Sequence, residues 1–252
     1  MSPNDAIEQM MSDNEVVDSA QTNRDLNRRQ RTSGRQENSV RREGAAIHDT
    51  LLWRLRAGMD FESPSGYVLG VTSGERRSGV STVAANLAIR AADNQMHPVL
   101  LVDANVRSPK QHRAFRLKGD IGLADVLVRG ATPEEAVQKT RYPGLDVLPL
   151  GLKDHFDRAR VAADAIDQLD KWMRESYTTV IVDLPDATDL RHTLLLARKA
   201  DSIVLVVRAE SSRRNDVKKA VAKLQQDGVS IGGVVLNRMR QYAPRWLVRR
   251  TS

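Results

Sequence analysis

Short apolar runs alternate with amphipathic stretches along most of this 252-residue chain. The apolar runs lie at residues 67–72, 98–102, 145–149, 180–183, 203–207 and 233–236. Helical periodicity separates them at residues 82–92, 133–139, 162–176, 190–199 and 213–226. Continuous apolar runs are typical of parallel strands buried on both faces, and strand–helix alternation requires right-handed crossover connections. The sequence therefore predicts one α/β domain with a doubly wound, mainly parallel sheet.

The remaining parts of the chain differ from this domain in composition. We expect a disordered, charged tail at residues 1–45, because its scattered apolar residues cannot bury enough surface to offset chain entropy. Residues 46–62 carry apolar side chains at three- and four-residue steps, which predicts an amphipathic helix. The α/β domain is expected at residues 63–240, and a basic tail at 241–252 follows it.

Composition narrows the classes of function. The chain has no cysteine, which excludes disulfides and thiolate metal centres. No segment approaches the roughly 20 apolar residues of a membrane span, so no transmembrane segment is predicted. The net charge of +7 is compatible with a nucleic acid, an anionic lipid surface or an acidic partner. Aromatic residues make up only 4%, which disfavours a stacking surface for single-stranded nucleic acid.

The loop after the first predicted strand has the frame of a phosphate-binding loop. Gly74, Gly79 and Ser81 match the pattern G-x-x-x-x-G-K-[ST], but Val80 stands where the pattern has lysine. In an intact loop, backbone N–H groups hold phosphate oxygens, the hydroxyl binds Mg²⁺, and the lysine neutralises the phosphate charge. The sequence thus predicts a phosphate-binding frame without its principal cation.

Two other predicted strands end in an acid, Asp103 and Asp183. Ligands of open parallel sheets bind outside the carboxyl ends of the strands, where carboxylates can hold Mg²⁺ directly or through water. For either acid alone, capping of the next turn is the favoured interpretation. The two acids together with the loop favour a metal site.

Motifs in eight segments resemble those of one known family. The segments are residues 71–73, 81–88, 99–109, 122–127, 145–151, 180–183, 200–208 and 233–238. They are similar to the cytoplasmic domain of bacterial tyrosine kinases (BY-kinases) of capsule and exopolysaccharide synthesis, the CpsD/CapB/Wzc type. These kinases are relatives of the MinD/ParA ATPases, so the resemblance implies a P-loop NTPase fold.

The resemblance also implies cofactors, roles and partners. The cofactors would be ATP or ADP with Mg²⁺, and the family's activity is protein-tyrosine phosphorylation. The residues implied at the nucleotide are Gly74, Arg77, Gly79, Val80, Ser81, Thr82 and Asn237. Thr82 would contact the α-phosphate, and Asn237 the adenine edge. Ser81, Asp103 and Asp183 would hold the metal, and the two acids would be the catalytic residues. The implied partner is a separate membrane-spanning polysaccharide co-polymerase (chain-length regulator) that would associate this cytoplasmic protein with the membrane.

Several positions depart from the family pattern. Val80 replaces the lysine, Arg77 replaces a loop glycine, and Asn105 replaces a second aspartate. Thr50, Trp53 and Arg56 align with a Glu-x-x-Arg-x-x-Arg motif for ring assembly, so homo-oligomerisation stays open. The C-terminal tail has a single tyrosine, Tyr242, where the family has a cluster.

These departures leave three hypotheses. The first is a pseudokinase of polysaccharide assembly with weak or no ATP chemistry. The second is an active autokinase in which Arg76 or Arg77 supplies the missing charge. The third is a ParA-like ATPase that binds DNA or a membrane surface through arginine-rich segments at 24–42 and 238–250. No base-reading motif is visible, so nucleic acid is the least favoured partner.

Overall fold

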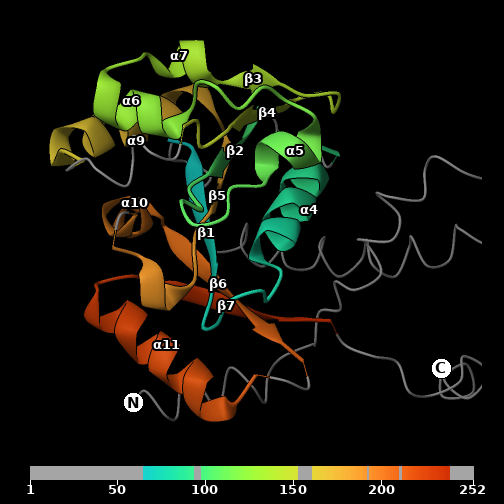
Figure 1. Cartoon of the computed structure of the whole chain (residues 1–252), viewed down its shortest axis with the longest axis vertical. Helices are drawn as coiled ribbons and strands as arrows, with labels where there is room; N and C mark the ends of the chain where they lie inside the picture. Colours follow the sequence, from blue (N-terminus) through green and yellow to red (C-terminus); the bar gives the residue numbers. More distant parts are fainter. Residues whose placement is uncertain (1–64, 94–97, 153–160, 192, 210–211, 239–252) are drawn as a thin grey trace, which may run out of the picture.

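The computed structural model describes residues 65–93, 98–152, 161–191, 193–209 and 212–238. These residues form one seven-stranded sheet with helices on both faces, which confirms the predicted fold class (Figure 1). The predicted tails at 1–45 and 241–252 and the predicted helix at 46–62 lie outside the described residues, so these boundaries stay predictions. No helix within the described ranges is long and apolar enough to cross a membrane.

The strands follow the order β3-β4-β2-β5-β1-β6-β7 across the sheet. Their bounds are β1 Tyr67–Ser73, β2 Val99–Asp103, β3 Gln138–Lys139, β4 Leu145–Leu148, β5 Thr179–Asp183, β6 Ser202–Arg208 and β7 Ile231–Asn237. All neighbouring strands are parallel except β3 and β4, which are antiparallel. The parallel strands therefore end at one common edge, which we name the carboxyl edge.

Helices cover both faces of the sheet. Their bounds are α4 Val80–Asp93, α5 Gln111–Phe115, α6 Leu123–Arg129, α7 Pro133–Ala136, α9 Ala163–Ser176, the 3₁₀ helix η1 Ala187–Asp189, α10 Leu194–Lys199 and α11 Arg214–Gln226. Buried residues of α4 pack on one face, while those of α6, α9, α10 and α11 pack on the other (Figure 1). Side chains of β2 alternate between these two faces, as they must along a strand. Val99 and Leu101 pack in the apolar cluster under α4 (the α4 cluster), and Leu100 and Val102 pack on the opposite face.

Two helices are shorter than the sequence predicts. The predicted helix at 133–139 ends at Ala136, because Gln138 and Lys139 pair with β4 as an antiparallel strand. The Nζ atom of Lys139 lies 2.7 Å from Oδ2 of Asp146, which adds an ion pair to this strand pairing. The predicted helix at 190–199 begins only at Leu194, because η1 forms a separate turn before it.

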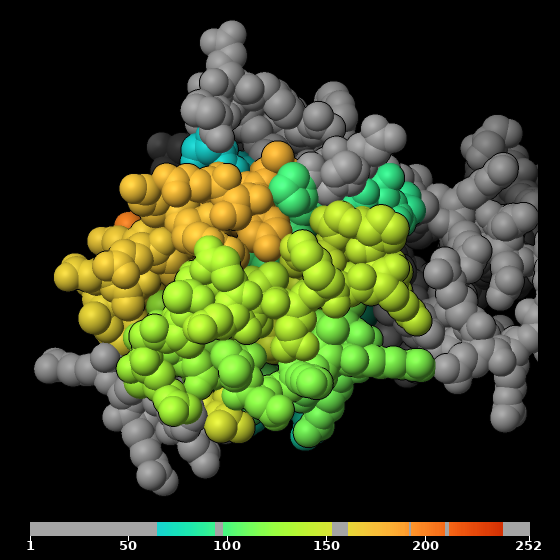
Figure 2. All heavy atoms as spheres, turned by 90° about the horizontal axis from the view of Figure 1, so that it is seen from above, coloured from blue at the N-terminus to red at the C-terminus, as the bar shows by residue number. Residues whose placement is uncertain are grey.

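The sheet ends beyond β4 in the short strand β3. In the space-filling view from above, green and yellow-green residues of the α5, α6, α7 and β3 region occupy much of the visible face (Figure 2). The edge strand β3 has only two residues. Short edge strands offer few free backbone groups for pairing with another chain.

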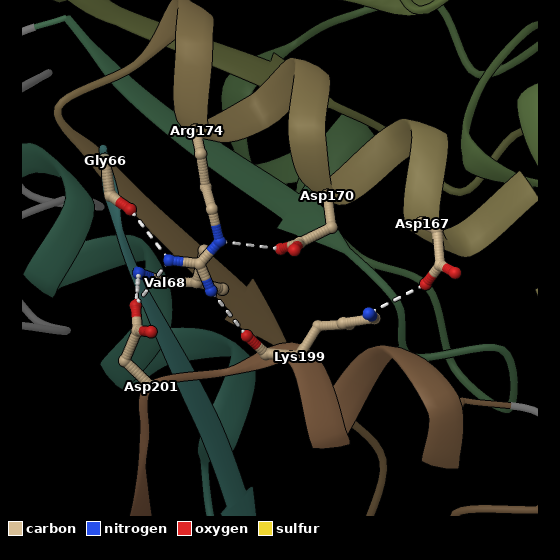
Figure 3. A network of polar contacts seen from close by, with 7 residues as sticks. All are labelled: Gly66, Val68, Asp167, Asp170, Arg174, Lys199 and Asp201. Atoms are coloured by element: carbon tan, nitrogen blue, oxygen red, sulfur yellow. Dashed lines mark hydrogen bonds and ion pairs between the residues drawn. The ribbon is translucent and has the colours of Figure 1, made fainter. Parts of the chain in front are cut away.

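Arg174 joins four segments at the opposite edge, where the parallel strands begin. Its guanidinium donates to the carbonyl groups of Gly66 (2.9 Å) and Lys199 (2.7 Å) and pairs with Asp170 and Asp201 (Figure 3). The Oδ2 atom of Asp201, which accepts from Arg174, also accepts from the N–H of Val68 at 2.7 Å. Arg174 thereby connects α9 with the start of β1, the end of α10 and the start of β6.

We expect Arg174→Ala to lower the free energy of unfolding by about 2–4 kcal/mol, because two carbonyl groups and two carboxylates lose their shared donor. Arg174→Lys should recover little of this loss, because a single ammonium cannot reach four acceptors as a planar guanidinium does. Urea denaturation measures both values. Lys171→Ala is the matched control on the same helix, since the side chain of Lys171 is 76% exposed and its Nζ lies 3.9 Å from Oε1 of Glu175. A loss in R174A no larger than in K171A would contradict the prediction.

Candidate functional site

The loop between β1 and α4 is held in shape by side chains that bind its carbonyl groups. The hydroxyls of Ser73 and Ser78 both donate to the carbonyl oxygen of Glu75, at 2.6 and 2.9 Å. Nδ2 of Asn237 donates to the carbonyl oxygen of Ser78 at 2.6 Å. Gly79 has φ 96°, and a Cβ there would lie 2.1 Å from the same Nδ2 atom. Only glycine fits this close approach of β7 to the loop.

Arg77 shares the left-handed backbone of the loop, with φ 61°. A residue with a Cβ in this conformation costs roughly 1–2 kcal/mol relative to the right-handed one. The loop thus keeps the backbone that suits the family's glycine even though an arginine occupies the position. Strain of this kind persists only where the surrounding contacts determine the conformation.

The backbone N–H groups of the loop are available to a ligand. Apart from the turn at residues 76–77, no backbone carbonyl of the described residues accepts a hydrogen bond from the N–H groups of residues 76–81. The N–H groups of Thr82 and Val83 donate to the carbonyl of Gly79, which starts α4. Consecutive unpaired N–H groups at a helix N-terminus form an anion-binding concavity. The backbone at this position fits the phosphates of a nucleotide.

Val80 contributes packing at the position of the missing lysine. Its side chain is 8% exposed and belongs to the apolar cluster between α4 and the sheet. Arg76 and Arg77 are exposed on the loop. The phosphate-binding frame therefore has donors but no buried cation at the lysine position.

Asp103 and Asp183 lie side by side at the carboxyl edge, as paired residues of β2 and β5. Both side chains are fully buried. Asp103 accepts from the N–H groups of Asn105 (3.2 Å), Lys110 (2.9 Å) and Gln111 (2.9 Å). Burial raises the pKa of Asp103 to about 6, against the effect of these hydrogen bonds. Burial and the charge of Asp103 raise the pKa of Asp183 to about 8.

Gln111, the first residue of α5, connects Asp183 to α4, and the sequence patterns did not predict this role. Its Nε2 atom donates to Oδ2 of Asp183 (2.7 Å) and to the carbonyl of Ser81 (3.0 Å). Both donors of the amide are thereby used, which fixes the direction of Oε1. A glutamine in a short polar segment gives no sequence signal, and its place becomes apparent only when α5 packs beside β2 and β5.

Two buried oxygens next to this contact lack partners. Among the described residues, neither Oε1 of Gln111 nor Oδ1 of Asp183 accepts a hydrogen bond of normal geometry. Unpartnered carboxylate and amide oxygens suit Mg²⁺, which binds through one or two carboxylates plus phosphates of the substrate. No group of three or more His, Asp or Glu side chains in the described segments could hold a metal alone. The donor set fits Mg²⁺ that arrives with a nucleotide.

The remaining predicted residues also lie at the carboxyl edge. Ser81 and Thr82 are in the first turn of α4. Asn237 ends β7 and contacts the loop, so its predicted contact with adenine stays a prediction. Asn105 stabilises a turn, because its Oδ1 accepts from the N–H of Ser108 at 3.2 Å.

Comparison with known proteins identifies relatives along most of the chain. The tyrosine-protein kinase YwqD of Bacillus subtilis is 32% identical over 189 residues, which are 72% of this chain and 75% of YwqD. The putative tyrosine-protein kinase CapB of Staphylococcus aureus is 28% identical over 67% of this chain and 74% of CapB. The putative kinase EpsB of Ralstonia nicotianae is 32% identical, but the matched part is only 24% of that longer protein. No family model matches the sequence.

Solved structures have the same fold. The kinase domain of Escherichia coli tyrosine kinase ETK superposes with a TM-score of 0.75 at 23% identity, over 91% of each chain. The chimerical protein CapA2B2 gives 0.70 at 24% identity, over 95% of this chain and all of the other. MinD of Pyrococcus horikoshii, complexed with Mg-ADP, gives 0.60 at 24% identity over 73% of this chain and 76% of MinD.

The buried acids predict a pH-dependent stability. The pKa of Asp183 lies above the unfolded value of about 3.9, so the free energy of unfolding falls as the pH rises from about 4 towards 8. Asp183→Asn removes this loss. We expect the gain in Tm over the wild type, in metal-free buffer, to be larger at about pH 8.5 than at about pH 5.

Asp120→Asn is the control for this experiment, because Asp120 is exposed. Its Tm should differ from the wild type by the same small amount at both pH values. An equal gain for D183N at both pH values would mean that Asp183 does not titrate in this range.

Proposed function

The chain belongs to the bacterial tyrosine-kinase family, and we propose that it is a pseudokinase of that family, which binds nucleotide weakly and transfers little or no phosphate. One observation carries this proposal. Apart from the turn at residues 76–77, no backbone carbonyl of the described residues binds the N–H groups of the loop, while the lysine position holds a buried valine, Val80. The chain therefore keeps the backbone groups that bind phosphate and lacks the lysine that neutralises its charge during transfer.

The proposed roles of the residues follow from their positions. The N–H groups of residues 76–81 would bind the phosphates of ATP or ADP, and Thr82 would contact the α-phosphate. The hydroxyl of Ser81, the carboxylate of Asp183 and Oε1 of Gln111 would orient Mg²⁺ directly or through water. The metal supplies positive charge to the phosphates when it is bound. Asp103 is held by three backbone N–H groups and would bind the metal together with Asp183.

The chemical step needs more than this frame. Phosphoryl transfer depends on positioning and on stabilisation of the charge on the transferring phosphate. Loss of one preorganised donor of this kind typically lowers the rate by about 10²–10³. A negative charge is also missing at Asn105, where the family has an aspartate. The amide oxygen of Asn105 accepts a hydrogen bond within a turn. Binding can therefore persist when turnover is lost.

The proposed setting is capsule or exopolysaccharide assembly on the cytoplasmic side of the membrane. The protein would act by contact with a membrane-spanning polysaccharide co-polymerase, the kind of partner expected for this family. Membership of the family supports this proposal. The competing ParA-like function rests mainly on arginine-rich segments outside the described residues.

We expect the purified protein to form no phosphotyrosine with ATP and Mg²⁺, and Val80→Lys to increase its affinity for ADP by about 10- to 100-fold, the worth of a hydrogen bond to a charged group. Calorimetric titration measures the affinity, and an anti-phosphotyrosine blot the reaction. Val80→Met is the control, because methionine has a similar length without the charge. Phosphotyrosine on the wild-type protein would refute the pseudokinase proposal.

The exposed arginines of the loop support one alternative, an active kinase with a relocated cation. Under that alternative ATP turnover disappears in Arg77→Ala and survives in Val80→Ala. Under the pseudokinase proposal turnover stays at background in both variants and in the wild type. A steady-state phosphate-release assay with Mg-ATP separates the two functions.

A further inference from the structure

The loop residue Glu75 is bound to the end of β6. Its carboxylate accepts a hydrogen bond from the hydroxyl of Ser212, and its Oε2 atom lies 3.4 Å from Nη2 of Arg208. Ser212 is in turn held by Arg208, because its Oγ accepts from the N–H of Arg208 at 3.0 Å. The N–H of Ser212 also donates to the carbonyl of Arg208 at 3.1 Å. A carboxylate of the phosphate-binding loop is thus joined to an arginine of the neighbouring strand.

The fold places Arg208 beside the phosphate-binding loop. Strand β6 pairs with β1, and Ser73 at the end of β1 is paired with Val206. Arg208 ends β6 two residues further on, at the carboxyl edge. Of the ion pairs within the described ranges, the one that reaches the loop from another element is the pair of Arg208 with Glu75.

Neither side chain of this pair is needed to shape the loop backbone. The carbonyl of Glu75 is bound by the hydroxyls of Ser73 and Ser78, and the carbonyl of Ser78 by Asn237. The Nε atom of Arg208 is buried and has no hydrogen-bond partner among the described residues. The contact with Glu75 uses Nη2, so the guanidinium keeps further N–H groups beside the loop.

A carboxylate on this loop opposes the binding of phosphates. Two like charges a few ångströms apart repel each other, and a carboxylate occupies the same face of a guanidinium that would bind phosphate. We infer that Arg208 is a phosphate-binding cation of this site, which takes over part of the role of the missing lysine, and that Glu75 competes with the ligand for it. This inference rests on the proposed nucleotide binding and names a residue that sets its strength.

The test is a mutant cycle on the full chain, with inorganic pyrophosphate and ADP as probes in Mg²⁺-free buffer. Glu75→Gln keeps the shape of the side chain and removes its charge. We expect E75Q to bind both probes roughly tenfold more tightly, the size of one charge-assisted hydrogen bond. Arg208→Ala should bind roughly tenfold more weakly. The double variant E75Q/R208A should lose the gain of E75Q.

Two controls separate charge from support of the loop. Ser212→Ala removes the hydroxyl contacts and keeps the charges of Glu75 and Arg208, so its affinity should stay within about twofold of the wild type. Arg213→Ala removes a nearby exposed arginine without a contact to Glu75, and its affinity should be unchanged. Thermal unfolding of every variant establishes that each one folds.

Each other outcome overturns the inference in a recognisable way. If wild type binds and E75Q binds equally or more weakly, Glu75 does not compete with phosphate. If E75Q/R208A keeps the full gain, the gain is repulsion alone and Arg208 is not the cation. If no variant binds either probe at millimolar concentration, the proposed nucleotide binding fails together with this inference.

Discussion

Side-chain hydrogen bonds to the carbonyl groups of the loop between β1 and α4 determine the shape of the site. Ser73, Ser78 and Asn237 bind the carbonyls of Glu75 and Ser78, so these contacts hold the backbone of the loop. The three side chains come from β1, the loop itself and β7, and the sheet order brings these elements together. This explains why Arg77 can occupy a left-handed position that glycine normally takes. The conformation is set by contacts of the backbone, and the side chain at position 77 is exposed.

The buried acids depend on the same sheet. Parallel pairing of β2 with β5 puts Asp103 opposite Asp183, and neither can avoid the other by reaching solvent. Gln111 and three backbone N–H groups reduce the free-energy cost of this arrangement without removing it, as the raised pKa values indicate. Two buried carboxyl groups side by side with raised pKa values are typical of functional sites, and a bound cation would favour their charged forms. This part of the site retains its chemistry, although the charge opposite the phosphates is absent.

Sequence patterns predicted the sheet and the main helices because apolar runs and helical periodicity are local properties. They failed at β3, where Gln138 and Lys139 pair with a strand that begins six residues later along the chain. They also located Asp103 and Asp183, since each acid directly follows a buried run. Most contacts of Gln111, Arg174 and Glu75 could not be predicted, because apart from Asp170 the partners of these side chains lie 25 to 137 residues away in the sequence. Polar side chains in polar segments acquire a function only through such distant partners.

The exchange of lysine for Val80 is compatible with a stable fold for a physical reason. Valine at this position is 8% exposed within the α4 cluster, and burial of such a side chain stabilises a protein by about 1.5–3 kcal/mol. A lysine there would have to leave the cluster to reach the phosphates. At position 80, a buried apolar side chain favours stability and a charged one favours phosphate transfer. The N–H groups of the loop bind phosphate without any change in the packing of side chains. A chain with valine at this position keeps the fold and the anion-binding backbone, and a protein cation for the phosphates has to come from another position. Arg208, at the end of β6 and in contact with the loop residue Glu75, is in the position to supply it.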